Sequence, residues 1–174
     1  RAQILAAETQ VAVDDLYRPY RPKRRTRATI AKEKGLEPLA NLILLQKMTV
    51  SPLEEAENYI NPEKEVSTAE DALNGAKDIL AESVSDNADF RTHIRELTMK
   101  HGQLLSAAKD PEAESVYEMY YEFSESLSKL AGHRILAISR GEKEKFLTVK
   151  IDAPVDRILS YLDRKLITAP SAPT

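Results

Sequence analysis

Apolar residues recur at helical spacing through the N-terminal half of the chain. Residues 2–17 contain almost no helix breaker, so they predict one helix that ends near Tyr17, where a pair of prolines follows. Thr26 is a suitable N-cap for a short helix that runs to Lys34, and Gly35 stands where a C′ residue belongs. Pro38 then predicts the first turn of another helix. This helix is rich in leucine and isoleucine, so we expect most of its surface to be buried.

Two further helix starts carry the capping-box pattern. Ser51–Glu54 predicts a helix that ends at the Asn61–Pro62 pair, and Ser67–Glu70 predicts the start of a longer one. Gly75 lies inside this longer helix and costs it about 1 kcal/mol relative to alanine, which favours a close contact with another helix there. Residues 86–102 predict one more helix, which stops at a glycine.

The C-terminal third is mixed. Residues 114–130 and 133–140 are helical in propensity. Residues 146–151 alternate between apolar and polar, as a strand does, and residues 103–107 are the only other candidate strand. A last helix opens near Pro154, and its apolar residues are expected inside: Val155, Ile158, Leu159, Leu162 and Leu166.

The predicted fold class is therefore mostly α, a multi-helical array with room for a small two-stranded β patch in the C-terminal third. The expected organisation is a helical region over 1–167 followed by a linker over 168–174. Within the helical region we distinguish a basic segment at 17–35, a helical core at 36–102 and a mixed segment at 103–167.

Composition narrows the class of protein further. Of the 174 residues, 42% are hydrophobic and 30% charged, as in soluble globular proteins, and the chain has no cysteine for a disulfide or a thiolate metal site. The longest apolar run, Leu42–Leu45, is far too short to span a bilayer. We therefore expect a cytoplasmic protein without membrane contact. Because it begins at Arg1 and ends in TAPSAPT, we expect a piece of a longer protein.

Charge is concentrated in the basic segment, YRPYRPKRRTRATIAKEKG. It carries +7, whereas the whole chain carries only −3, so the other 155 residues carry −10. Its cations are the candidate nucleic-acid-binding residues: Arg18, Arg21, Lys23, Arg24, Arg25, Arg27, Lys32 and Lys34. They could contact phosphates without reading sequence, or they could pair with acidic helices of the same protein. Pro19 and Pro22 favour extended backbone at Arg18 and Arg21.

The histidines, serines and glycines of the chain lack the spacing that metal sites, serine-hydrolase sites and nucleotide-binding loops require. His93, His101 and His133 have no helical i, i+4 spacing. No serine lies in a G-x-S-x-G elbow, and the chain has neither a G-x-G-x-x-G nor a Walker loop. We therefore expect no enzyme activity, no catalytic residue, no metal and no cofactor.

Two other groups of residues are candidates for nucleic-acid contact. Tyr117, Tyr120 and Tyr121 have the spacing of a buried helix face and acidic neighbours, which favours core packing over stacking on bases. A weaker secondary basic surface comprises Arg134, Arg140, Lys143 and Lys145. Its RGEKEK sequence predicts an exposed turn with ion pairs.

Two long blocks of the chain resemble a known family. LYRPYRPKRRTRATIAKEKGLEPLANLIL and FSESLSKLAGHRILAISRGEKEKFLTVKI are similar to segments of the bacterial Tex transcription accessory proteins. The resemblance covers nearly all the chain, with one departure at Ala131–Gly132, where we expect Pro-Ser. It implies a helical N-terminal part that precedes RNase H-like, helix-hairpin-helix and S1 RNA-binding domains.

The resemblance also implies nucleic-acid binding in transcription or RNA handling, with no catalytic role for this part. RNA and single- or double-stranded DNA are the expected partners, met mainly through the full-length protein, together with its other domains and the transcription machinery. We expect the basic segment to add phosphate contacts to an architectural scaffold. The alternative is a protein-interaction or interdomain scaffold with no nucleic-acid contact of its own, and the two differ in whether the arginines are free or already paired.

Overall fold

The computed structural model describes residues 2–22 and 24–168. Lys23 and most of the expected linker lie outside the described residues. The chain divides into two compact units, one formed by residues 1–92 and 161–174 and the other by residues 93–160. Helices dominate, with a small antiparallel sheet in the second unit, which confirms the predicted fold class.

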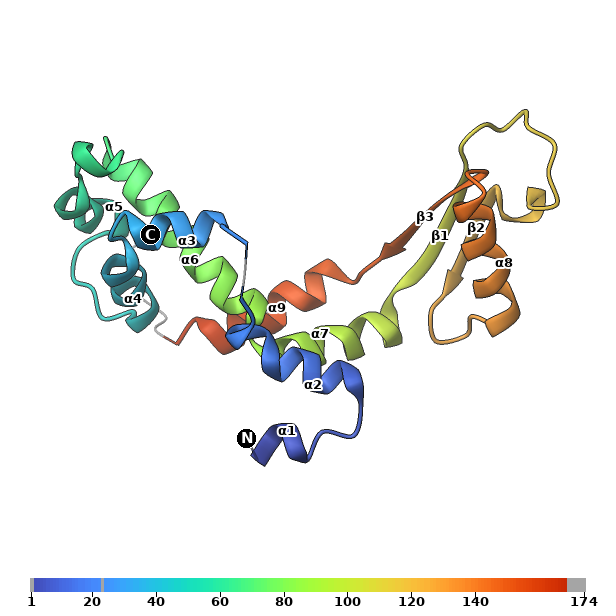
Figure 1. Cartoon of the computed structure of the whole chain (residues 1–174), viewed down its shortest axis with the longest axis horizontal. Coiled ribbons are helices and arrows are strands. Elements are labelled where there is room, and N and C mark those ends of the chain that lie inside the picture. Colours follow the sequence, from blue (N-terminus) through green and yellow to red (C-terminus); the bar gives the residue numbers. More distant parts are fainter. Residues whose placement is uncertain (1, 23, 169–174) are drawn as a thin grey trace. The chain divides into compact units, whose positions relative to one another are not determined.

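The first unit is built around the longest helix, α6 (Ala69–Asp86). The helices α3 (Arg27–Glu33), α4 (Glu37–Leu45) and α5 (Pro52–Ala56) pack against it, as Figure 1 shows. The shared core is aliphatic and rich in alanine, with Leu36, Leu39 and Val66 almost completely buried beside Ala72 and Ala76.

Local capping signals define most of these helices. Thr26 accepts a hydrogen bond from the Thr29 N–H, and Ser51 forms the predicted capping box with Glu54. Gly35 has φ +85° and ends α3 in a Schellman motif, in which the Leu36 N–H bonds to the Ala31 carbonyl (3.1 Å). The prediction for α6 was wrong by one residue, because its capping box joins Thr68 to Asp71.

The N-terminal helix differs from its prediction. Residues 2–17 form two helices, α1 (Ala2–Leu5) and α2 (Gln10–Tyr17), because the Thr9 side chain accepts from the Ala12 N–H and starts a new helix. A 3₁₀ turn, η1 (Arg18–Tyr20), follows α2. Arg18 is therefore helical rather than extended, whereas Arg21 is extended as predicted (ψ 134°).

Short elements complete this unit. The 3₁₀ turns η2 (Glu57–Tyr59) and η3 (Pro62–Lys64) follow α5. Helix α7 (Ala88–His101) follows α6 and carries the chain into the second unit. The last helix, α9 (Val155–Leu166), returns to the first unit, where the Gln46 side-chain amide donates to the Leu166 carbonyl and accepts from the Thr168 N–H.

The second unit contains β1 (Gln103–Ala108), β2 (Glu122–Ser126) and β3 (Leu147–Asp152), with β1 in the centre and both neighbours antiparallel to it. Helix α8 (Gly132–Lys143) lies beside this sheet in Figure 1. Residues 114–130 were predicted to be a helix, which was wrong. They form the 3₁₀ turn η4 (Glu118–Tyr120) and β2, because pairing with β1 satisfies their backbone.

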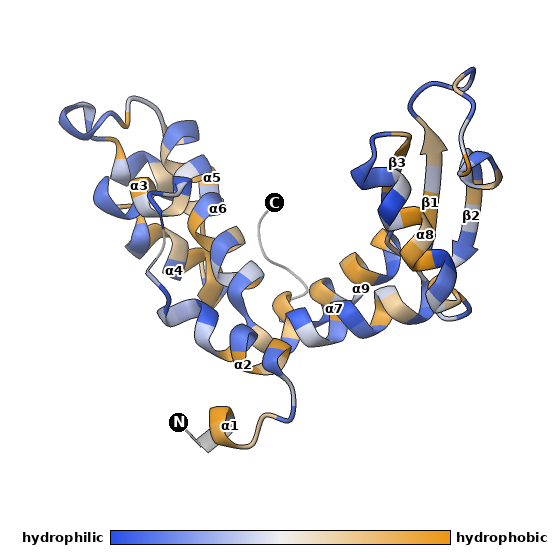
Figure 2. Cartoon of the chain, turned by 45° about the vertical axis from the view of Figure 1, so that its right-hand side comes forward, coloured by the Kyte–Doolittle hydropathy of each residue, from blue (hydrophilic) through white to orange (hydrophobic). Residues whose placement is uncertain are grey.

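The expectation for α9 was also partly wrong. Figure 2 shows apolar residues along this helix, yet none of the residues described in it is fully buried. Val155 is 57% exposed and Leu159 is 52% exposed. None of the helices in the described ranges combines the length and apolar character that crossing a membrane requires.

The packing at Gly75 generates a stability prediction. A Cβ added there would lie 2.3 Å from Leu36 Cδ1 and 3.3 Å from Ala31 Cβ. Because Leu36 is buried and cannot swing away, we expect Gly75→Ala to lower the free energy of unfolding by about 1–3 kcal/mol, despite the better helix propensity of alanine. Urea unfolding followed by far-ultraviolet circular dichroism measures this change.

The neighbouring Asn74 is exposed and provides the control. Asn74→Ala should leave stability unchanged or raise it by up to about 0.7 kcal/mol. The double variant Leu36→Ala/Gly75→Ala should lose less stability than the two single changes added together. If the Gly75→Ala and Asn74→Ala proteins were equally stable, the result would contradict the close contact between Gly75 and Leu36.

Candidate nucleic-acid interface

One face of α6 carries an acidic stripe that holds the basic segment. Its side chains are four residues apart, so they lie on one side of the helix: Asp78, Glu82 and Asp86. Arg27 Nε lies 3.5 Å from the Asp78 carboxylate, the Thr26 hydroxyl donates to Glu82 (3.0 Å), and Arg18 Nε donates to Asp86 (2.9 Å). The segment therefore meets the stripe in reverse order along the chain, and the stripe fixes its path.

Other cations of the segment also have carboxylate partners. The pairs are Arg25 with Glu33 (3.0 Å), Lys32 with Glu37 (3.5 Å), and Lys34 with Glu65 (3.5 Å). In each of these pairs at least one side chain is more than half exposed. Such surface pairs contribute only about 0–1 kcal/mol each and are screened by salt. They orient the cations without committing them strongly to one partner.

Arg21 and Arg24 differ from these tethered cations. Both are exposed, and neither forms an ion pair or side-chain hydrogen bond with the described part of the chain. Lys23, which lies between them, is outside the described residues. Two exposed guanidinium groups without an ionic partner in the described chain therefore lie between the tethered residues Arg18 and Arg25.

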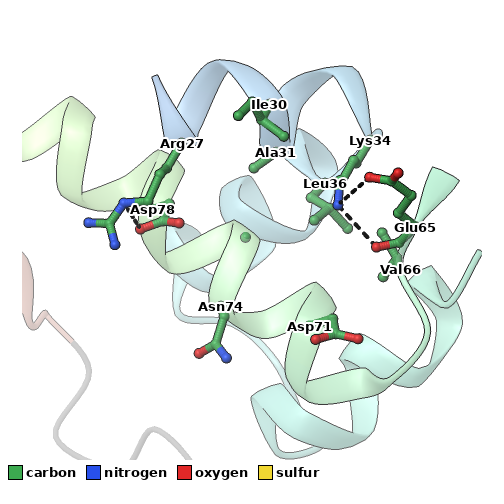
Figure 3. Close-up of a pocket in the computed structure, with 11 residues that line it drawn as sticks. Arg27, Ile30, Ala31, Lys34, Leu36, Glu65, Val66, Asp71, Asn74 and Asp78 are labelled. Atoms are coloured by element: carbon green, nitrogen blue, oxygen red, sulfur yellow. Dashed lines mark hydrogen bonds and ion pairs between the residues drawn. The ribbon is translucent and has the colours of Figure 1, made fainter. Parts of the chain in front are cut away.

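A pocket of about 280 Å³ lies between α3 and α6, next to the basic segment. Figure 3 shows Arg27 directed at Asp78, and Lys34 reaching both the carboxylate and the backbone carbonyl of Glu65 (3.0 Å to the carbonyl). Asp71 adds a third carboxylate to the lining against these two cations. The pocket is therefore net acidic and unsuited to a phosphate, so the candidate interface is the exposed surface and not this pocket.

A more buried ion pair fixes the helix that leads into the segment. Arg91 of α7 donates from Nε to Asp15 of α2 at 2.6 Å, and its Nη1 donates to the Ser85 carbonyl at 3.3 Å. Asp15 is only 4% exposed. Low solvent exposure makes such a charge-assisted hydrogen bond stronger than the surface pairs and makes its loss more costly.

Within the described chain, the secondary basic surface also contains both paired and unpaired cations. Arg134 Nη1 donates to Glu125 of β2 at 2.7 Å. Arg140, Lys143 and Lys145 are exposed and form no ion pair among the described residues, so the ion pairs predicted for RGEKEK are absent there. Glu144, one of the two acidic residues of this sequence, instead accepts a hydrogen bond from the Tyr117 hydroxyl.

The tyrosine cluster next to this surface is part of the core. Tyr117 and Tyr120 are buried, and Tyr121 packs against the same cluster, which confirms core packing although the segment is not a helix. The Tyr117 hydroxyl donates to Glu144 at 2.9 Å. Burial, together with this hydrogen bond and the negative charge of Glu144, raises the pKa of Tyr117.

The histidines do not converge on a metal site. Within the described residues, no group of three or more His, Asp or Glu side chains is arranged to hold a metal ion. His101 instead lies 3.2 Å from the Arg157 guanidinium. Its pKa is lowered by burial, and the positive charges of Arg157 and Lys100 lower it further.

Comparison with known proteins identifies the family of the chain. The family model described as Tex central region-like matches residues 47–166. The chain belongs to the Tex family. It is 50% identical over 158 residues to the "Uncharacterized protein YdcI" of Bacillus subtilis, covering 89% of this chain and 22% of that protein.

Two other relatives have informative names. The "Protein tex" of Bordetella pertussis is 42% identical over 157 residues, which cover 88% of this chain and 20% of that protein. The human "S1 RNA-binding domain-containing protein 1" is 31% identical over 159 residues, which cover 86% of this chain and 16% of that protein. The chain therefore spans about a fifth of the length of its Tex relatives.

The contrast between the buried and exposed pairs can be tested by stability. We expect Arg91→Gln to lower the free energy of unfolding by about 1–3 kcal/mol, because Asp15 loses a charge-assisted hydrogen bond in a buried place. Arg25→Gln removes the same charge from an exposed pair and should change stability by less than about 0.5 kcal/mol. Urea unfolding measures the free energy of unfolding of both variants. Equal losses would contradict the expected difference between the buried and the exposed ion pair.

Proposed function

We propose that this chain is a nucleic-acid-associated architectural domain of a Tex protein, in which Arg21 and Arg24 contact phosphates without reading sequence. The observation that carries the proposal is the division of the basic segment. Its cations on both sides are tethered by carboxylates, whereas Arg21 and Arg24 are exposed and lack an ionic partner in the described chain. A guanidinium group with free donors suits a phosphate, which it can bind through two parallel hydrogen bonds.

The tethered cations support this role indirectly. The bonds from Arg18 and Thr26 to the acidic stripe of α6 fix the segment before any ligand arrives. A strand that binds there does not have to order a flexible arm, which lowers the entropic cost of binding. Two arginines without ionic partners in the described chain also imply fewer phosphate contacts than the eight candidate cations of the basic segment would allow.

In the whole protein this domain contributes a scaffold and a minor share of the affinity. The name of the human relative includes an S1 RNA-binding domain. We assign the main binding to such a part of the Tex protein, with RNase H-like and helix-hairpin-helix domains arranged on the scaffold. In this function the chain performs no catalytic step, uses no cofactor and acts in the cytoplasm.

A second candidate function rests on the ion pairs themselves. Five of the eight candidate cations already contact carboxylates of the same chain: Arg18, Arg25, Arg27, Lys32 and Lys34. Most of the positive charge is thus partly neutralised within the fold. In this alternative the basic segment stabilises the domain and docks onto an acidic domain of the same protein or onto the transcription machinery, without contacting nucleic acid.

Fluorescence anisotropy of a labelled single-stranded RNA across a salt series tests the proposal. We expect the affinity of the unaltered chain to fall with salt, and the log–log slope to become shallower by about 1.4 in Arg21→Gln/Arg24→Gln, since each phosphate on a single strand contributes about 0.7. The variant should unfold like the unaltered chain, because both side chains are exposed.

The matched control is Arg25→Gln/Arg27→Gln, which removes the same charge from two tethered arginines. Its slope should change less, because these side chains are already engaged by carboxylates. An equal change in both variants would argue against the assignment to Arg21 and Arg24. No binding at low salt would favour the docking function.

A further inference from the structure

Two tyrosines beside the free arginines are left without a role by the fold. Tyr17 is 50% exposed and Tyr20 is 77% exposed. Neither forms a ring contact or a hydroxyl hydrogen bond with the described residues. The other five tyrosines pack in a core, stack on another ring or hydrogen-bond through the hydroxyl: Tyr59, Tyr117, Tyr120, Tyr121 and Tyr161.

The backbone places the two tyrosines three residues apart on a continuous helical stretch. Tyr17 is the last residue of α2 and Tyr20 the last residue of η1, and the backbone between them is helical. Residues three apart on a 3₁₀ helix are eclipsed, and three residues rise by about 6 Å. Pro19 fixes one φ angle in this turn, and the bond from Arg18 to Asp86, whose side chain is 12% exposed, anchors it.

Exposed aromatic rings next to unpaired arginines are the two components of surfaces that bind single strands. The arginine contacts the phosphate, and a base stacks on the ring whatever its sequence. In a duplex each base already stacks on its neighbours, with a step of about 3.4 Å along the axis. The spacing of about 6 Å between the two tyrosines along the helix axis exceeds that step, so it suits bases that have been separated.

We propose that Tyr17 and Tyr20 form a stacking surface for unpaired bases, which makes the basic segment prefer single-stranded over double-stranded nucleic acid. This inference rests on the proposed function, because Arg21 and Arg24 bring the strand to the rings. Tyrosine and arginine are also frequent in protein interfaces. Because Arg21 and Arg24 form no ion pair with the described chain, a polyanion is favoured instead.

The test compares three labelled probes of equal length by anisotropy: a single-stranded RNA, the same strand in a duplex, and an abasic strand. In Tyr17→Leu/Tyr20→Leu, which keeps apolar side chains but removes both rings, we expect about a tenfold or greater loss of affinity for the single strand. Affinity for the duplex and the abasic strand should stay within about twofold. The salt slope should not change, because no charge is removed.

Tyr17→Phe/Tyr20→Phe keeps the rings and should bind the single strand like the unaltered chain. An unchanged affinity in the leucine variant, or equal losses on all three probes, would overturn the stacking surface while leaving the phosphate contacts intact. If Arg21→Gln/Arg24→Gln also binds every probe normally, the proposed function fails as well. Absence of binding to all probes at low salt overturns both and leaves the exposed rings as a protein-docking surface.

Discussion

The close approach of α3 and the turn after it to α6 is the constraint on which the first unit depends. Gly75 lets Leu36 lie where any larger side chain would collide, and Ala72 and Ala76 are completely buried in the same core. Because the buried residues of this core are small or aliphatic, its helices pack tightly, and Tyr59 packs against the core from its edge. This packing also determines which acidic residues of α6 face α3, so the same contact that stabilises the core sets the electrostatics of its surface.

The path of the basic segment follows from that arrangement. Arg18 at Asp86 and Arg27 at Asp78 fix two points eight residues apart on α6, a distance of about 12 Å at 1.5 Å per residue. The nine steps of chain between these arginines could span more than twice that distance if fully extended. The connection is therefore longer than the distance it has to cover, and the η1 turn takes up part of the difference. Arg21 and Arg24 lie on this connection and form no ion pair with the three acidic residues of the stripe.

The predictions from sequence succeeded where the determining interaction is local. Gly35 was recognised as a C′ residue, and the Ser51 capping box was recognised too, because their partners are within a few residues. The strand Glu122–Ser126 was missed because its partner β1 lies about twenty residues away, and the local propensity of residues 114–130 favours a helix. The acidic stripe of α6 was readable as an i, i+4, i+8 pattern, but its contact with the basic segment depends on tertiary packing.

The concentration of positive charge in the basic segment therefore has two consequences. Some of its cations pair with carboxylates, and others have no ionic partner in the described chain. The weak surface pairs of Arg25 and Arg27 neutralise part of the segment, and this prevents a highly charged arm from repelling itself. Arg21 and Arg24 form no ion pair in the described chain, so a phosphate that approaches them does not have to displace a carboxylate. Pro19 and the bond from Arg18 to Asp86 hold the η1 turn, so the backbone that carries Tyr20, and Tyr17 just before it, is preorganised. Preorganisation of this kind raises affinity by reducing the entropy lost on binding, even where few contacts are made.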